Sequence, residues 1–492
     1  MREPLEVVVS LVRVLVLGIV VVVTVAAGDW SRFRGPNGSG VVDAGHLPSE
    51  IGPESNVVWK TPLPEGHSSP ILSGDRIYLT GVEGGSRTDA GRAKVRDEGR
   101  LFTICLDLDS GEILWKREAP RPRIERYQPA NSGASPSPVA DSDNVYVFFG
   151  DYGLISYTAD GVERWRLPLG PFNNVNGHGS SPIVLGDRLY LLCDQDTDSY
   201  FLAVEKDTGK IAWKTMRPEV TRSYSTPTVY EPEDGPTELI VPGSYYLTSY
   251  SAETGEKLWW VSHMSWQPKS VPVIHNGLLI ANSVEPAGAG ATGSVVSFAE
   301  LLEEADQDNN DRISEAELKN VRPRMRFETT DLDFDGQLDR RDWEFYVARR
   351  TARNRMVAVR LGGRGDLTDS DRVVWSLERF LPNVPSPLIY EGVLYLVKDG
   401  GILSSLDPET GEIFKQGRLG DAIDTYYASP VAADGKVYLI SVSGQSTVLQ
   451  AGAQWEILSS SNFEDAVNAT PAIHDGRIYL RTKSALYCFA DK

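Results

Sequence analysis

The sequence has few cysteines, and those present lie far apart. Only Cys105, Cys193 and Cys488 occur among the 492 residues. Zinc sites need cysteines at short, fixed spacings, and no such spacing is present. An odd number cannot all pair within one chain, and each cysteine lies in an apolar run such as TICLDL or YLLCDQ. We therefore expect three buried free thiols.

Basic residues are also scarce. There are 49 lysines and arginines against 68 aspartates and glutamates, which gives a formal charge of −19. Nucleic-acid binding requires a basic surface that neutralises phosphates. The sequence therefore predicts no nucleic-acid partner, and its acidic surface is suited to cations.

Long hydrophobic runs are confined to the N-terminus. Arg2 and Arg13 precede the apolar run VLVLGIVVVVTVAAG (14–28), and Val-Ala-Ala at 25–27 is a small-residue cleavage pattern. This pattern predicts a signal peptide at 1–27 and an exported protein, either periplasmic, cell-envelope or extracellular. The alternative is an uncleaved membrane anchor. No later run is long and apolar enough for a transmembrane span in the mature chain.

Common catalytic signatures are missing as well. The sequence has no phosphate-cradling P-loop and no HExxH zinc motif. The GHGSS at 177–181 lacks the GxSxG spacing of a nucleophile elbow. We therefore predict no catalytic residues from motifs.

What the chain does have is an internal repeat. One sequence motif recurs eight times, as in SSPILSGDRIYLT (68–80) and TPAIHDGRIYLR (470–481). It consists of a small polar residue, a proline, apolar residues, a turn and an apolar strand. Its marker prolines are Pro70, Pro138, Pro182, Pro227, Pro272, Pro387, Pro430 and Pro471. A second phrase, as in LDLDSGEILWK (106–116), joins two apolar runs through a glycine turn and predicts a hairpin. Each period of about 45 residues thus holds four short strands, typical of a propeller blade.

The two ends of the chain complete this count. The last repeat lacks its tryptophan-bearing strand, and VVWKTPL (57–63) supplies one. The fold class predicted is all-β, an eight-bladed β-propeller closed by an N-terminal strand. The propeller would span 57–295 and 353–492, after an N-terminal extension at 28–56. The repeated tryptophans are predicted to pack between blades, and they are Trp115, Trp165, Trp213, Trp259 and Trp455.

The proline-containing strand, the TGE turn and the following tryptophan together resemble the pyrroloquinoline-quinone (PQQ)-like β-propeller family. The stretch DWSRFRGPNGSG (29–40) is similar to the start of exported bacterial members. This resemblance implies either a quinone-dependent dehydrogenase or a non-enzymatic scaffold. Dehydrogenases of this fold typically hold PQQ over the propeller axis with a calcium ion and often use a vicinal cysteine pair, which this chain lacks.

Two longer intervals separate the marker prolines, and both indicate insertions. The interval from Pro70 to Pro138 contains EGGSRTDAGRAKVRDEGR (83–100), which predicts a mobile surface loop. The interval from Pro272 to Pro387 contains two acidic twelve-residue segments, here called the acidic dozens: DQDNNDRISEAE (306–317) and DLDFDGQLDRRD (331–342). Apolar residues at helical spacing flank each dozen. The segment 296–352 therefore resembles a small helical EF-hand pair inserted in blade five.

The spacing within each dozen matches the oxygen ligands that calcium requires at loop positions 1, 3, 5, 7, 9 and 12. The first set is Asp306, Asp308, Asn310, the Arg312 carbonyl, Ser314 and Glu317. The second set is Asp331, Asp333, Asp335, the Gln337 carbonyl, Asp339 and Asp342. At position 8, Ile313 and Leu338 are expected to meet in a short β-contact.

Each loop departs once from the calcium-loop pattern. The first has Asp311 where glycine is usual, and the second has Asp342 where the longer glutamate is usual. Both changes are expected to weaken binding, and weak sites suffice in an exported protein. We expect a mainly structural role for Ca²⁺; the alternative is a solvated acidic loop without an ion.

These observations favour an exported calcium-binding scaffold over a PQQ-dependent dehydrogenase acting on alcohols or sugars. A scaffold would bind a protein or glycan partner through its propeller loops, as a monomer. If a site exists, it should lie where the segments before the marker prolines converge at the propeller mouth. The side chains expected there are His67, His178, Tyr224, Lys269, Asn383, Tyr426 and Asn468.

Overall fold

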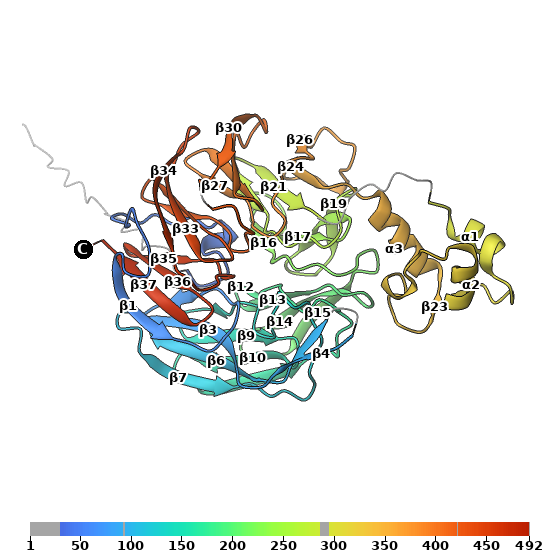
Figure 1. Cartoon of the computed structure of the whole chain (residues 1–492), viewed down its shortest axis with the longest axis horizontal. Helices are drawn as coiled ribbons and strands as arrows, with labels where there is room; N and C mark the ends of the chain where they lie inside the picture. The colour runs from blue at the N-terminus through green and yellow to red at the C-terminus, as the bar shows by residue number, and fades with distance from the viewer. Residues whose placement is uncertain (1–29, 92–93, 286–294, 421, 492) are drawn as a thin grey trace, which may run out of the picture.

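The computed structural model confirms an eight-bladed β-propeller (Figure 1). It describes residues 30–91, 94–285, 295–420 and 422–491, so the predicted signal peptide at 1–27 lies outside the described residues. Eight antiparallel sheets of four principal strands surround one axis. In the described part of the chain, no helix is long and apolar enough to cross a membrane.

The strands of the first four blades follow one another along the chain. Blade one contains β2 (Ile71–Ser73), β3 (Arg76–Glu83), β6 (Arg100–Asp107) and β7 (Ile113–Glu118). Blade two contains β8 (Val139–Ala140), β9 (Asn144–Phe149), β10 (Gly153–Thr158) and β11 (Glu163–Pro168). Blade three contains β12 (Ile183–Leu185), β13 (Arg188–Cys193), β14 (Tyr200–Glu205) and β15 (Ile211–Met216). Blade four contains β16 (Thr228–Tyr230), β17 (Glu238–Gly243), β18 (Tyr246–Ser251) and β19 (Lys257–Val261), and β25 (Gly365–Asp366) joins its outer edge.

The remaining blades include the two departures from simple chain order. Blade five contains β20 (Val273–His275), β21 (Leu278–Ser283), β24 (Arg355–Arg360) and β26 (Val373–Leu377). Blade six contains β27 (Leu388–Tyr390), β28 (Val393–Lys398), β29 (Ile402–Leu406) and β30 (Ile413–Arg418). Blade seven contains β31 (Val431–Ala433), β32 (Lys436–Ile440), β33 (Gln445–Gln450) and β34 (Glu456–Asn462). Blade eight contains β35 (Ala472–His474), β36 (Arg477–Arg481), β37 (Ala485–Ala490) and the N-terminal β1 (Val57–Pro62).

The ring closes as predicted. Strand β1 pairs antiparallel with β37, with Trp59 opposite Cys488. Between blades, the Trp115 indole donates to the Ala159 carbonyl at 2.8 Å. A Cβ on Gly161 in the same turn would come within 2.7 Å of that indole, and φ there is +78°. The turn glycine is therefore required both by its backbone conformation and by the tryptophan packed on it. The three cysteines are buried and free, as expected.

A ring of hydroxyls ties the inner strands together. In seven of the eight blades, the residue before the marker proline is serine or threonine. Each of these hydroxyls accepts a hydrogen bond of 2.9–3.0 Å from the backbone N–H at the equivalent position in the preceding blade. The ring members are Ser69, Ser137, Ser181, Thr226, Ser386, Ser429 and Thr470. The eighth position is Val271, so the ring has one break.

The N-terminal extension crosses the axis, which the sequence did not predict. The backbone of Leu72 in blade one donates to the Trp30 carbonyl, and that of Ala432 in blade seven donates to Gly40. The Arg34 guanidinium donates to the Pro387 carbonyl in blade six at 2.9 Å. This segment therefore connects blades that are far apart in the sequence.

The segment 83–100 contains a hairpin that the sequence did not predict. Its strands β4 (Arg87–Asp89) and β5 (Val95–Asp97) pair as a hairpin. Val95 and Tyr127 exchange two backbone hydrogen bonds of 2.9 Å, which fix the hairpin against the loop that leads to blade two.

The helical insertion lies between β21 and β24, the second and third strands of blade five. It contains α1 (Phe298–Ala305), α2 (Glu315–Val321) and α3 (Arg340–Thr351) around their own small core. The helix expected before the second acidic loop is reduced to one 3₁₀ turn, η2 (Phe327–Thr329). In Figure 1 the insertion projects from the side of the propeller, with α1 and α2 farthest out.

Candidate metal centre and propeller mouth

The first acidic loop folds around the carboxylate of its first residue. The Asp306 carboxylate accepts the backbone N–H of Asn310 at 3.2 Å and that of Asp311 at 3.0 Å. The Glu317 carboxylate closes the loop, because it accepts the N–H of Gln307 at 2.9 Å and that of Ser314 at 2.8 Å. Two carboxylates eleven residues apart thus point into one loop.

The second loop has nearly the same hydrogen bonds, differing at one of the two donors to its first carboxylate. The Asp331 carboxylate accepts the N–H of Phe334 at 2.7 Å and that of Gly336 at 3.2 Å. The Asp342 carboxylate accepts the N–H of Leu332 at 2.9 Å and that of Asp339 at 3.1 Å. The shorter side chain of Asp342 therefore still reaches the two backbone groups that Glu317 reaches in the first loop.

The two loops are joined back to back. Ile313 pairs with Leu338 in the short antiparallel contact of β22 (Ile313–Ser314) and β23 (Gln337–Leu338), as expected. The Arg312 guanidinium also lies 2.6 Å from the Asp335 carboxylate. A change in one loop therefore reaches the other through one β-ladder and one ion pair.

Two acidic triads could each hold a metal ion. Asp306, Asp308 and Glu317 offer oxygens within 4.8 Å of one another, and Asp331, Asp333 and Asp335 do the same. The first triad uses loop positions 1, 3 and 12, and the second uses positions 1, 3 and 5. The second triad does not include Asp342, the residue at position 12.

The pKa values of the two carboxylates at position 12 are shifted in opposite directions. Hydrogen bonds from Ser314 lower the pKa of Glu317. Burial raises the pKa of Asp342 to about 7, and the nearby carboxylates add to this effect. Burial therefore disfavours the ionised form of Asp342, and a cation bound beside it would stabilise that form.

Three of the predicted side-chain ligands also form hydrogen bonds within their own loop. The Asn310 side-chain oxygen accepts the N–H of Arg312 at 2.8 Å, and the Asp335 carboxylate accepts that of Gln337 at 2.8 Å. The Ser314 hydroxyl donates to Glu317 at 2.6 Å. All twelve predicted positions therefore lie in the two loops, with six of them in the triads.

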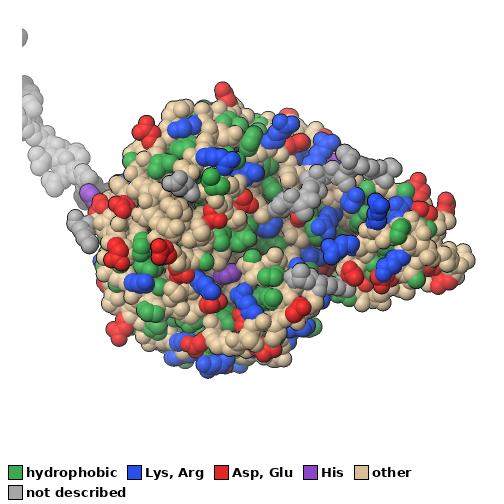
Figure 2. All heavy atoms as spheres, in the orientation of Figure 1, with side chains coloured by type: hydrophobic (Ala, Val, Ile, Leu, Met, Phe, Trp, Pro, Cys, Tyr) green, Lys and Arg blue, Asp and Glu red, His purple; other side chains and the backbone are tan. Residues whose placement is uncertain are grey.

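The second loop contacts the propeller, and the described residues show no such hydrogen bond for the first loop. The Asn173 amide donates to the Leu332 carbonyl at 2.7 Å, and the Arg341 guanidinium donates to the Asp196 carbonyl at 2.7 Å. The Arg126 guanidinium lies 4.6 Å from the centre of the Phe334 ring. Figure 2 shows Lys and Arg side chains gathered where the insertion meets the propeller, whereas acidic side chains mark its far end.

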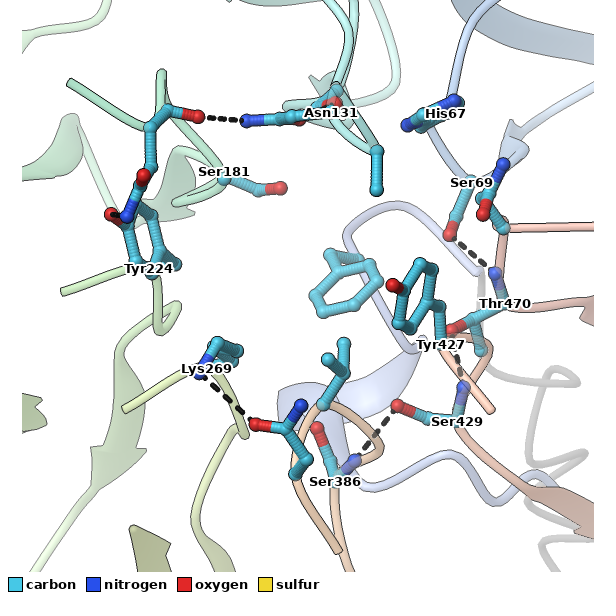
Figure 3. Close-up of a pocket in the computed structure, with 18 of the residues that line it drawn as sticks. His67, Ser69, Asn131, Ser181, Tyr224, Lys269, Ser386, Tyr427, Ser429 and Thr470 are labelled. Carbon is cyan, nitrogen blue, oxygen red and sulfur yellow. Dashed lines mark hydrogen bonds between the residues drawn. The ribbon is translucent and has the colours of Figure 1, made fainter. Parts of the chain in front are cut away.

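A cavity of about 380 Å³ occupies the propeller mouth (Figure 3). The residue three before each marker proline lines it in all eight blades, with Phe33 of the N-terminal extension also in the lining. These eight residues are His67, Ser135, Gly179, Tyr224, Lys269, Val384, Tyr427 and Asn468. The expected side chains of His67, Tyr224, Lys269, Asn383 and Asn468 are thus brought together.

Two of the expected mouth residues do not line this cavity. Tyr426 is buried and donates to the Ala422 carbonyl at 3.1 Å. His178 is buried with its ring centre 4.4 Å from that of Phe172. In both cases the next residue along the chain, Tyr427 or Gly179, lines the cavity, because neighbouring residues of an extended segment point to opposite sides.

The fold and the two triads define a class: an eight-bladed β-propeller with a helical insertion that offers two acidic, metal-suited loops. The family described as outer membrane protein assembly factor BamB matches residues 97–273 and 246–492. The chain belongs to this family of PQQ-like, BamB-type propellers. No curated protein matches the sequence.

Solved structures share the fold at low identity. BamB from Moraxella catarrhalis is 11% identical with a TM-score of 0.52, covering 89% of this chain and 97% of that one. A europium-containing methanol dehydrogenase is 10% identical with a TM-score of 0.57, covering 94% and 98%. Quinohemoprotein alcohol dehydrogenase from Comamonas testosteroni is 11% identical with a TM-score of 0.52, covering 94% and 81%. Such likeness shows the propeller fold alone.

Proposed function

We propose that this protein is an exported, calcium-binding scaffold whose two acidic loops form an EF-hand pair. The observation that carries the proposal is the duplicated wiring of the loops. In each, the carboxylates of positions 1 and 12 are fixed by backbone N–H groups at equivalent positions, and position 8 pairs across the two loops.

The chemistry of the loops supports Ca²⁺ in particular. Calcium takes six to eight oxygen ligands in flexible geometry, and each loop offers several carboxylates beside backbone carbonyls. Positive φ angles occur at positions 4 and 6 of both loops: Asn309 (56°), Asp311 (61°), Phe334 (63°) and Gly336 (84°). The first loop therefore keeps the curvature of the second although it lacks the glycine.

A scaffold role is supported by the family and by the propeller mouth. The family's description names an outer membrane protein assembly factor, which fits an exported propeller that acts in the cell envelope. A protein or glycan partner would contact the loops at the mouth, beside the insertion. Calcium would hold the insertion in one position at that site.

The mouth does not fit PQQ. This planar cofactor carries three carboxylates and is used with a metal ion, so it requires several cations and an oxygen-rich metal site. The cavity is lined by one lysine, Lys269, and one glutamate, Glu285. Within the described residues, both acidic groups suited to a metal lie in the insertion rather than at the mouth. We therefore derive no oxidation step through a quinone.

Calorimetric titration of the chelator-treated protein with CaCl₂ tests the proposal. We expect two binding events and a rise in Tm on loading. Asp306→Ala and Asp331→Ala should each remove one event, and the double variant should lose the Tm shift. Glu303→Ala, which changes an exposed acidic residue of α1 outside the loops, is the matched control. Two events persisting in the double variant would disprove the assignment.

Equilibrium dialysis with PQQ in millimolar calcium tests the scaffold role separately. We expect no saturable uptake by the folded, calcium-loaded protein. Stoichiometric uptake would replace the scaffold proposal with a quinone-dependent dehydrogenase, and alcohols and sugars would then be the substrates to assay.

A further inference from the structure

The mouth cavity combines one position from every blade with an aromatic residue of the N-terminal extension. Eight of the lining residues stand three before a marker proline, so the repeat places one such position from each blade at the cavity. Unlike the hydroxyl ring one layer away, this set varies in chemistry from blade to blade. These eight positions are equivalent in the repeat but carry different residue types. Such a set of side chains at a cavity is suited to recognising a ligand.

Several polar groups of this wall have unused hydrogen-bonding capacity. Lys269 Nζ donates to the Asn383 side-chain oxygen at 3.1 Å and to the Gln267 carbonyl at 3.0 Å, which uses two of its three protons. Among the described residues, the side chains of His67, Tyr427 and Asn468 have no hydrogen-bond partner. Figure 3 shows Lys269, His67 and Tyr427 around one common space.

On the opposite side of the mouth, the polar side chains form hydrogen bonds with other groups of the protein. The Asn176 amide donates to the Tyr224 hydroxyl at 2.9 Å and accepts from Lys94 at 2.7 Å. The Asn131 amide donates to the Asn176 carbonyl at 2.8 Å. The unsatisfied groups therefore come from blades one, five, seven and eight and define one half of the cavity.

The charges of the lining limit the ligand. Among the described residues, Lys269 is the one lysine or arginine in the lining, and burial lowers its pKa to about 8, so it remains largely protonated at neutral pH. Burial lowers the pKa of His67 to about 3, so His67 is neutral. The carboxylate of Glu285 also lines the wall, where it contributes to the electrostatics of both Lys269 and Arg349. One cation and one carboxylate among neutral donors and acceptors suit a ligand with several hydroxyls and a single carboxylate, which would lie on the lysine.

We propose that the mouth cavity binds a carboxylated sugar, with the carboxylate on Lys269 and the hydroxyls on His67, Tyr427 and Asn468. The rings of Phe33, Tyr224 and Tyr427 offer apolar faces for the sugar ring. The volume of about 380 Å³ lies at the lower end of small-molecule sites, which suits a small ligand. The inference deepens the proposed scaffold role by naming a glycan partner, and it does not require calcium.

The test is a saturation-transfer NMR and calorimetric titration of the calcium-loaded full chain with glucuronate, galacturonate and N-acetylneuraminate, with glucose as the neutral comparison. We expect saturable binding of at least one acidic sugar and at least tenfold weaker binding of glucose. Lys269→Met should weaken acidic-sugar binding at least tenfold, and Tyr427→Phe a few-fold. Lys483→Met, a lysine exchange outside the mouth, should leave it unchanged.

Each outcome decides the proposal. Failure of all three acidic sugars to bind would overturn it, and equal binding of glucose would overturn the role of Lys269. If Lys269→Met fails to fold, as judged by Tm, Tyr427→Phe still tests the site, because unchanged affinity in that variant would contradict the assignment. Calcium binding measured on the same samples distinguishes this failure from failure of the calcium proposal.

Discussion

The two acidic loops have nearly the same backbone wiring but different surroundings. The Asp306 loop lies at the outer end of the insertion, whereas the Asp331 loop contacts propeller loops through Leu332, Phe334 and Arg341. Asp331 and Asp342 are buried, but Asp306 is not. A shared sequence pattern therefore predicts local wiring, while its place in the fold decides what the loop is coupled to.

The largest expected difference comes from removing the first carboxylate of each loop. Loss of one charged ligand should reduce the binding free energy of calcium at its own loop by about 3 kcal/mol, which corresponds to roughly 100-fold weaker binding. Asp331→Ala should also increase hydrogen exchange in the propeller loops around Asn173, whereas Asp306→Ala should not. Equal exchange in both variants would remove the distinction between the loops.

Breaking the docking contacts should have a smaller effect. Arg341→Ala removes the hydrogen bond to the Asp196 carbonyl, which at about 1.5 kcal/mol corresponds to roughly tenfold weaker calcium binding at the second loop. Arg340→Ala is the matched control, since Arg340 is exposed and lies near Glu344 on the same helix. Calcium titrations should show weaker binding in Arg341→Ala than in Arg340→Ala. Identical curves would show that the contact between the second loop and the propeller does not contribute to calcium affinity.

Lengthening position 12 of the second loop should make it more like the first. Asp342→Glu places a carboxylate where it can join Asp331, Asp333 and Asp335. We expect a several-fold gain in calcium affinity, on the order of 1 kcal/mol. Glu317→Asp should produce the reverse change in the first loop. A loss of affinity in Asp342→Glu would mean that the buried position cannot accept the extra methylene.

The smallest expected effect is at position 6 of the first loop. Asp311 has φ +61°, which costs an L-residue about 1 kcal/mol that glycine does not pay. Asp311→Gly should therefore stabilise the loaded first loop, with up to fivefold tighter binding. Asn309→Gly, at the other positive-φ position, serves as the comparison. Weaker binding in Asp311→Gly would show that its carboxylate matters more than its backbone.

The parts of the molecule that depend on spacing could be predicted from sequence. The marker prolines predicted eight blades, and the acidic dozens predicted the contact of Ile313 with Leu338. Contacts between distant segments, such as Asn173 with Leu332, have no local signature and could not be predicted. The residues that line the mouth were predicted only in part. The prediction named Tyr426, but its neighbour Tyr427 points to the opposite side of the chain and lines the cavity. The single turn before Asp331 was missed because flanking apolar residues do not show how many helical turns form.

The segment that crosses the axis has a consequence for when the molecule can be completed. Gly40 bonds to Ala432, and β1 pairs with β37, so residues of the N-terminal extension meet partners that are synthesised several hundred residues later. Contacts of such long sequence separation form late, after most loops have closed. The residues of the N-terminal extension therefore remain without these contacts during synthesis. In a chain interrupted before β37, β1 has no strand to pair with and the propeller ring stays open. Completion of the fold therefore requires that synthesis has passed β37.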